Sequence, residues 1–166
     1  FTNLSLDIET GFDGSLYSVG VQYFGEKSFE LVYMLSDEDK TISEKLNYYS
    51  TEKKLILAFL KDYFKLDPDI IIGWHVVGFD LNFLINKCLK LNIDFNIGRD
   101  NKPISIDEKK GLGFFTNIKG RVIIDGPPAM RAAFYQFKNF KLDTVASEVL
   151  GTSKDIASDA GKVSEI

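Results

Sequence analysis

Three carboxylates have the residue types and spacing of a metal-dependent nuclease site. Asp7 and Glu9 lie in the segment Leu-Asp-Ile-Glu-Thr, where an apolar run ends, and Asp80 follows a second apolar run further along the chain. Mg²⁺ prefers oxygen ligands, and two such ions about 3.5–4 Å apart can stabilise both the attacking and the leaving oxygen of a phosphodiester displacement. We therefore expect these acids to bind two Mg²⁺ ions, for which Mn²⁺ can substitute.

The elements around these acids explain how they would meet. Residues 4–9 alternate between apolar and polar, which predicts a strand with Asp7 and Glu9 on the face opposite the apolar side chains. Residues 69–73 resemble a buried parallel strand, and a helix is predicted over residues 80–91 with the third acid in its first turn, where the helix dipole also favours it. Active sites of open α/β sheets lie at the carboxyl ends of strands, so the three carboxylates should converge there.

The remaining pattern predicts a mixed α/β fold. Further strands are expected at residues 16–24 and 29–35, a polar, glycine-rich loop at residues 94–111, and a hairpin over residues 113–125 that turns at Lys119-Gly120. Helices are expected at residues 51–64, 129–137 and 142–150. This order favours an antiparallel three-strand meander that leads into crossover strands, with helices on both faces of the sheet.

Bulk composition limits the class of protein. A chain of 166 residues with 45% hydrophobic and 27% charged residues is typical of one globular domain with a real core. Its single cysteine excludes an internal disulfide and suits a reducing compartment, and one Cys with one His leaves too few ligands for an ordinary zinc site. No apolar run approaches the roughly 20 residues of a membrane span. We expect a cytoplasmic domain cut from a longer protein, because the chain begins inside a strand without Met.

The charge is unevenly distributed. The net charge of −4 is unlike that of a free-standing DNA-binding protein, which is usually basic. Residues 119–142, however, carry five basic side chains against one acid, Asp125; the basic residues are Lys119, Arg121, Arg131, Lys138 and Lys141. This cluster is either a solvated face or a flank that contacts phosphates. Asp125, which ends a predicted strand before Gly-Pro-Pro, is either a fourth metal ligand or a turn residue.

Two motifs resemble those of the proofreading 3′→5′ exonuclease domain of family B DNA polymerases. Residues 1–10, Phe-Thr-Asn-Leu-Ser-Leu-Asp-Ile-Glu-Thr, are similar to the first exonuclease motif, and residues 71–84, Ile-Ile-Gly-Trp-His-Val-Val-Gly-Phe-Asp-Leu-Asn-Phe-Leu, are similar to the second. Residues 98–101, 120–126 and 142–151 look like the bacterial DNA polymerase II group within that family. The resemblance covers nearly the whole chain and implies a ribonuclease-H-like fold.

The resemblance also implies roles for individual residues. Asp7 would bridge both metal ions, Glu9 would bind one and orient the attacking water, and Asp80 would bind the other. Substrate contacts would come from Thr10, His75 and Phe79. The reaction would remove a mismatched nucleotide from the single-stranded 3′ end of a DNA primer. The implied partners are the remaining polymerase domains and a sliding clamp bound through them, in the bacterial cytoplasm at the nucleoid, with no membrane.

The sequence departs from this family at two points. The family usually has Asn, which holds the substrate strand, where this chain has His75, although an imidazole can still offer one hydrogen bond. The family's third motif, a Tyr followed four residues later by Asp, does not occur after Gly151. We therefore expect residues 1–166 to be a single exonuclease domain truncated before that motif, which binds metal weakly and is nearly inactive alone.

Three alternatives stay open. One is a non-catalytic scaffold or DNA-binding module of the polymerase, although the intact acids favour an enzyme. Another is an RNA-directed exonuclease of the same fold, which would tolerate a substrate 2′-hydroxyl. Finally, His75 and Asp80 also have the spacing of the third motif in histidine-type exonucleases. No acid between Glu9 and His75 follows a strand with an aromatic before it, so the second-motif interpretation is favoured.

Overall fold

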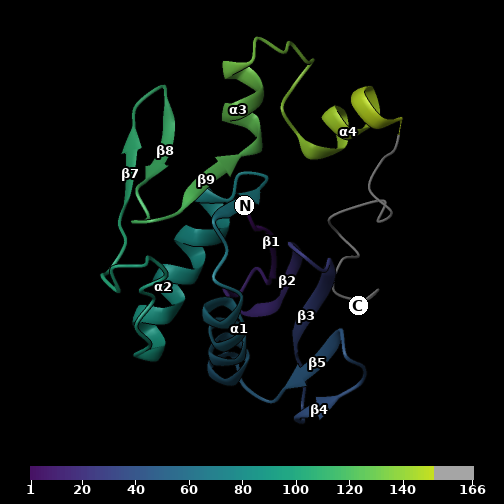
Figure 1. Cartoon of the computed structure of the whole chain (residues 1–166), viewed down its shortest axis with the longest axis vertical. Coiled ribbons are helices and arrows are strands. Elements are labelled where there is room, and N and C mark those ends of the chain that lie inside the picture. Colours follow the sequence, from purple (N-terminus) through teal and green to yellow (C-terminus); the bar gives the residue numbers. More distant parts are fainter. Residues whose placement is uncertain (152–166) are drawn as a thin grey trace. The chain divides into compact units, whose positions relative to one another are not determined.

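The largest feature of the molecule is a seven-stranded mixed sheet with the strand order β4-β5-β3-β2-β1-β6-β9, seen in a computed structural model that describes residues 1–151 (Figure 1). Its centre is the antiparallel meander that the sequence predicts, made of β1 (Asn3–Thr10), β2 (Leu16–Phe24) and β3 (Phe29–Leu35). In this meander Asp7 lies opposite Gly20. The strand that carries two of the candidate acids is therefore central in the sheet.

Parallel strands extend the sheet on both sides of the meander. β6 (Ile70–Gly73) pairs with β1, and β9 (Val122–Asp125) pairs with β6, both in parallel. On the other side, β5 (Leu46–Tyr49) pairs in parallel with β3, and the two-residue β4 (Lys40–Thr41) pairs with β5. The meander with its crossover strands is the mixed α/β architecture expected of the ribonuclease-H-like class, and that fold class is confirmed.

Two helices bury the apolar face of this sheet. α1 (Glu52–Leu66) begins where the Thr51 side chain accepts the backbone N–H of Lys54, and its buried stripe packs against β2, β3 and β5. α2 (Asn82–Leu91) packs against α1 and continues from a π-helical turn, η1 (Val77–Leu81). No helix within residues 1–151 is long and apolar enough to cross a membrane.

The core holds β1 in place through every second residue. Leu4, Leu6 and Ile8 are at most 4% exposed, as the alternation predicts, and they belong to the same buried cluster as Leu84 and Cys88 of α2. Burial of one large apolar side chain contributes about 1.5–3 kcal/mol. The opposite face of β1, which carries the acids, is thus presented by a strand that its apolar residues anchor firmly.

The segment between α2 and β9 differs from the prediction. The hairpin lies earlier in the chain, where β7 (Ile106–Lys109) pairs with β8 (Gly113–Thr116). Its turn uses Gly111 and Gly113, whose φ angles of 78° and 99° favour glycine. The turn expected at Lys119-Gly120 exists, but it leads into β9, which pairs with β6 instead of β8. A long-range parallel partner thus overrode the local hairpin pattern.

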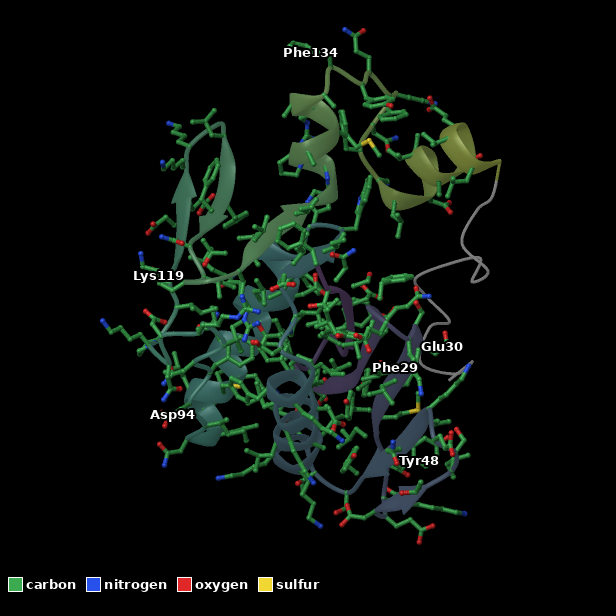
Figure 2. The ribbon with its side chains drawn as sticks, viewed as in Figure 1. Phe29, Glu30, Tyr48, Asp94, Lys119 and Phe134 are labelled. Atoms are coloured by element: carbon green, nitrogen blue, oxygen red, sulfur yellow. The ribbon has the colours of Figure 1, made fainter. Side chains whose placement is uncertain are left out.

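The described chain divides into two compact units, residues 1–126 and the residues from Pro127 onward. The helices of the second unit are α3 (Gly126–Ala132) and α4 (Leu142–Leu150). α3 begins and ends earlier than the predicted helix, because prolines are accommodated in its first turn and Phe134, labelled in Figure 2, has a left-handed φ of 63°. α4 has the predicted bounds, with Gly151 as its left-handed C-cap.

Candidate functional site

The carboxyl end of β1 carries Asp7, Glu9 and Thr10. Strand alternation puts both acids on the face opposite the core; Asp7 is exposed, and Glu9 and Thr10 are half-buried. The ladder between β1 and β2 shifts register between Glu9 and Thr10, because Tyr17 is an extra residue on β2. Such a bulge redirects the side chains around it, so Thr10 leaves the regular alternation directly after the two acids.

The end of β6 approaches β1 unusually closely at Gly73. A Cβ at this position would lie 2.9 Å from the carbonyl oxygen of Leu6 and 2.6 Å from the Cβ of Val76, so glycine is required here. His75 follows with a left-handed φ of 60°. Asn and His are both enriched among the few non-glycine residues that adopt this conformation. The backbone therefore supplies one reason for His where the resembling family usually has Asn.

Asp125, at the end of β9, fixes the turn around His75. One carboxylate oxygen accepts the backbone N–H of His75 at 2.8 Å, and the other accepts that of Val77 at 3.2 Å. The side chain thus satisfies two donors ahead of η1 and stabilises the left-handed residue between β6 and the helix. Of the two roles that the sequence left open for Asp125, these bonds support the turn role.

The turn η1 brings Asp80 back to β1. Within it, the backbone N–H of Leu81 donates to the carbonyl of Val76, a five-residue separation that widens the helix by one residue. Asp80 is only 1% exposed, and its Oδ1 accepts the backbone N–H of Ile8 at 3.0 Å. β6 pairs with β1 only as far as Ser5. Further along β1, the Asp80 carboxylate accepts the backbone N–H of Ile8, which a neighbouring strand would otherwise accept.

Burial and neighbouring charge raise the pKa of Asp80 to about 7. The main cause is the loss of water around the carboxyl group, followed by the negative charge of Asp7 and, less strongly, that of Asp125. The hydrogen bond from Ile8 opposes this rise but does not cancel it. Two acids from distant parts of the chain therefore meet, and a cation between them would relieve both the burial and the repulsion.

The donor set fits a hard cation. Asp7, Glu9 and Asp80 offer only carboxylate oxygens, which suit Mg²⁺ better than Zn²⁺. Within residues 1–151, however, no three side chains of His, Cys, Asp or Glu lie close enough together to hold a metal ion. Repulsion between like charges is a physical reason for such acids to stay apart when no cation joins them. The structure thus brings Asp7 and Asp80 together, and the convergence of Glu9 with them stays a prediction.

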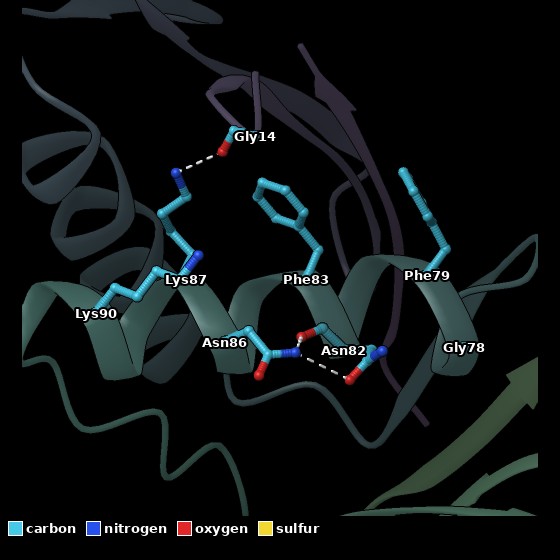
Figure 3. Close-up of a pocket in the computed structure, with 8 residues that line it drawn as sticks. All are labelled: Gly14, Gly78, Phe79, Asn82, Phe83, Asn86, Lys87 and Lys90. Carbon is cyan, nitrogen blue, oxygen red and sulfur yellow. Dashed lines mark hydrogen bonds between the residues drawn. The ribbon is translucent and has the colours of Figure 1, made fainter. Parts of the chain in front are cut away.

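A groove of about 250 Å³ runs along η1 and α2 (Figure 3). Gly14, in the turn between β1 and β2, lines one side, and the helical side chains line the other. Phe79, a predicted substrate contact, is 50% exposed and lies in this groove. The other two predicted contacts, His75 and Thr10, are not among its lining residues. Sequence reasoning did not single out Phe83, although its four-residue spacing from Phe79 signals a shared helical face.

An ion pair between Lys87 and Glu52 lies at one wall of the groove, and no sequence motif predicts it. The Nζ of Lys87 donates to the carbonyl of Gly14 at 2.6 Å and to Oε1 of Glu52 at 2.7 Å, as Figure 3 shows for Gly14. The same Oε1 accepts the backbone N–H of Leu16 at 2.6 Å. The two side chains are only 12% and 22% exposed. Lys87 and Glu52 therefore join α2, the start of α1 and the turn that follows the acids of β1.

The predicted basic cluster has no common role. Arg121 is neither solvated nor open to phosphate, since its side chain is 2% exposed and donates to the carbonyl of Ile97 at 2.7 Å. It also pairs with Asp67 at 2.8 Å and lies 4.9 Å from the ring centroid of Tyr63. Lys119, in contrast, is exposed. Both interpretations of the cluster are wrong for Arg121, because folding uses its guanidinium internally.

Comparisons with known proteins agree on one family. The family model described as DNA polymerase family B, exonuclease domain, matches residues 21–145, which include Asp80. DNA polymerase II of Escherichia coli (strain K12) is 38% identical over 169 residues, which cover 98% of this chain and 21% of that protein. A DNA polymerase of Thermococcus sp. (strain 9oN-7) is 30% identical over 160 residues, which cover 93% of this chain and 20% of that protein.

The extent of these matches defines what they establish. The chain spans only about a fifth of the length of the two polymerases, so it corresponds to one region of them. The family model, in turn, matches well over half of the chain. The motifs around Asp7 and Asp80, the mixed sheet and the similarity to polymerases lead to the same assignment. The chain belongs to the exonuclease domain family of the family B DNA polymerases.

Proposed function

We propose that this domain hydrolyses the 3′-terminal phosphodiester of DNA and so proofreads, in the 3′→5′ direction, for a bacterial family B polymerase. The observation that supports this proposal most directly is that the Asp80 carboxylate lies near that of Asp7. The carboxylate of Asp80 is 1% exposed and accepts the backbone N–H of Ile8, between the two acids of β1. Its pKa is raised by burial and, next, by the charge of Asp7. Such an arrangement is costly for folding alone and suits a site that binds cations.

In this proposal the three acids Asp7, Glu9 and Asp80 hold two Mg²⁺ ions, for which Mn²⁺ can substitute. When bound, the ions supply positive charge that stabilises the attacking and leaving oxygens of the displacement. The bond from Ile8 to Oδ1 of Asp80 sets the direction of the remaining carboxylate oxygen. Glu9 orients the attacking water. The terminal nucleotide is held by three side chains around the acids, Thr10, His75 and Phe79.

The rest of the polymerase contributes to this function. No Tyr with an Asp four residues later occurs between Gly151 and Ile166. We propose that residues 1–166 form a single exonuclease domain fragment without the third motif, and that they are nearly inactive alone. The parent polymerase would present the frayed primer end in the bacterial cytoplasm, with a sliding clamp as a further partner.

The test is digestion of 5′-labelled single-stranded DNA with Mg²⁺ or Mn²⁺. Three proteins are compared: this chain, the full-length parent polymerase, and the parent with Asp7→Ala. Only the wild-type parent should shorten the DNA from its 3′ end at a substantial rate, while Asp7→Ala should retain nucleotide addition. A folded wild-type parent that does not cut would make the domain a scaffold. Preference for a 3′-terminal ribonucleotide over a deoxyribonucleotide would favour the RNA alternative.

A further inference from the structure

The groove along α2 has the composition of a nucleic-acid contact surface. Its helical side chains fall into two rows with four-residue spacing, which puts each row on one helical face. One row contains Phe79, Phe83 and Lys87, and the other contains Asn82, Asn86 and Lys90. None of the eight lining residues is acidic, although the chain as a whole has a net charge of −4.

Each kind of side chain in the groove suits a part of a single strand. Figure 3 shows the rings of Phe79 and Phe83 rising from the same side of the helix. Phe79 is exposed and Phe83 is half-buried against the core. Aromatic rings that reach the surface stack on bases of any sequence, and such stacking underlies much single-strand binding. The exposed amide of Asn86 offers hydrogen bonds, although it also donates to Asn82. An exposed lysine such as Lys90 is a typical phosphate contact.

The groove begins beside the candidate site and leads away from it along α2. It begins at Gly78 and Phe79, directly beside Asp80 in η1, and ends at Lys90. The eleven steps from Phe79 to Lys90 correspond to a helical rise of about 16 Å, which is several times the roughly 3.4 Å rise of one stacked nucleotide. The ion pair between Lys87 and Glu52 fixes the wall toward Gly14 and neutralises the charge of Lys87. Lys90, which lies one helical turn further on, carries its charge on the surface.

We propose that this groove, the α2 track, binds the few nucleotides immediately 5′ of the terminal one. The proposal rests on the proposed function, because the site at Asp7 and Asp80 would take the terminal nucleotide. Phe83 stacks with a base of these nucleotides, next to the terminal nucleotide held at Phe79, and Lys90 contacts a backbone phosphate. The track therefore contributes to binding of a longer strand and leaves the reacting phosphodiester untouched. Affinity should depend on the length of the single strand, and hydrolysis of a minimal substrate should not.

The first experiment compares two substrates in the full-length polymerase without deoxynucleotides. One is a 5′-labelled eight-nucleotide oligothymidylate, and the other is the p-nitrophenyl ester of thymidine 5′-monophosphate, which is too short to reach the track. Phe83→Leu keeps an apolar side chain against the core and removes the ring. Lys90→Ala removes the cation, and Lys61→Ala, on an exposed position of α1, is the matched control.

Phe83→Leu should raise KM for the oligonucleotide at least about fivefold, as the loss of a stacking contact implies. Lys90→Ala should also raise this KM, through the loss of a phosphate contact. Both variants should leave hydrolysis of the ester unchanged. Lys90→Ala should also flatten the slope of log KM against log salt concentration by about 0.7, the value for one phosphate contact on a single strand. The proposal would be overturned if the track variants impaired both substrates equally. It would also be overturned if their KM for the oligonucleotide did not differ from that of Lys61→Ala.

A second experiment does not depend on cleavage. Oligothymidylates with 4-thiothymidine second, third or fourth from the 3′ end are photocrosslinked to the polymerase in EDTA, and the attached peptide is identified by mass spectrometry. Crosslinks within residues 78–90 support the track, even if the protein releases no nucleotide and the proposed function has failed. Crosslinks elsewhere, from a polymerase that does release nucleotides, refute the track alone.

Discussion

Oδ1 of Asp80 lies 3.0 Å from the backbone nitrogen of Ile8 and accepts its hydrogen. This bond ties a side chain of η1 to the strand position between Asp7 and Glu9. It also separates two properties of Asp80. The position of the side chain depends on an oxygen acceptor, which an amide also has, whereas its charge is unfavourable in a buried site beside Asp7. Substitution can therefore remove the charge and keep the position.

Asp80→Asn should abolish excision and stabilise the metal-free protein. The pKa of Asp80 is raised from 3.8 to about 7, so the folded state binds this proton more tightly than the unfolded state. Stability of the metal-free wild type should therefore fall as pH rises from about 4 to about 7, and then level off. The Asn variant lacks this fall and should be more stable at pH 8, by an amount on the order of 2–4 kcal/mol.

Urea unfolding in EDTA at several pH values between 5 and 8 measures this difference. Excision of labelled DNA by the same variant in the parent polymerase gives the second readout. Parallel stability curves for the two proteins would show that Asp80 is charged in the folded state at low pH, contrary to the expectation.

Gly73→Ala should impair excision more than an ordinary glycine substitution. Its Cβ would lie 2.9 Å from the carbonyl oxygen of Leu6, and backbone cannot move aside as a flexible side chain can. The end of β6 would have to shift away from β1, and Asp80 would shift with it. Gly20→Ala is the matched control, because its Cβ would meet only the carbonyl oxygen of Asp7 at 3.8 Å. Excision rates and melting temperatures of both variants test this, and equal losses would contradict it.

His75 offers a way to distinguish backbone from side chain. His75→Asn should change stability by less than about 0.5 kcal/mol, since Asn tolerates the left-handed φ of 60°. His75→Val should cost about 1–2 kcal/mol or more, because a β-branched residue is poorly tolerated there. His75→Gly keeps the backbone and deletes the side chain. If the imidazole holds the substrate strand, KM for single-stranded DNA rises in the glycine variant while its stability does not fall.

Arg121→Met should destabilise the domain by about 3 kcal/mol, with little direct effect on DNA affinity. It removes a guanidinium that is 2% exposed and leaves the carbonyl of Ile97 without this donor. Lys119→Met, two residues earlier on an exposed position, should change stability by less than about 0.5 kcal/mol. Urea unfolding gives both values. A stable Arg121 variant with weakened DNA binding would restore the phosphate-flank interpretation.

Local patterns predicted the elements that carry the acids. The alternation of β1 and the apolar run of β6 both specify structure through neighbouring residues, as does Gly151 at the end of α4. Each of these signals is complete within a few residues. For this reason the approach of Asp7 and Asp80 followed from the sequence once two parallel strands were inferred.

Features that depend on distant partners were missed. The apolar run of β9 looked like half of a hairpin, and only its pairing with β6 distinguishes the two arrangements. Lys87 and Glu52 lie on separate helices, and neither segment contains a sequence signal that predicts their ion pair. Arg121 has the sequence context of a surface arginine, but its packing on Tyr63 makes it internal. These contacts exist only once the sheet is assembled.

The wide turn η1 has a consequence for insertions and deletions. One extra residue in a helical turn rotates everything before it by about 100° relative to everything after it, since a regular helix has 3.6 residues per turn. Loss of a single codon among residues 77–79 would restore a regular helix and leave α2 intact. The domain would still fold, yet its buried carboxylate would face another direction. A one-residue deletion in this turn should therefore silence the site while leaving its architecture in place.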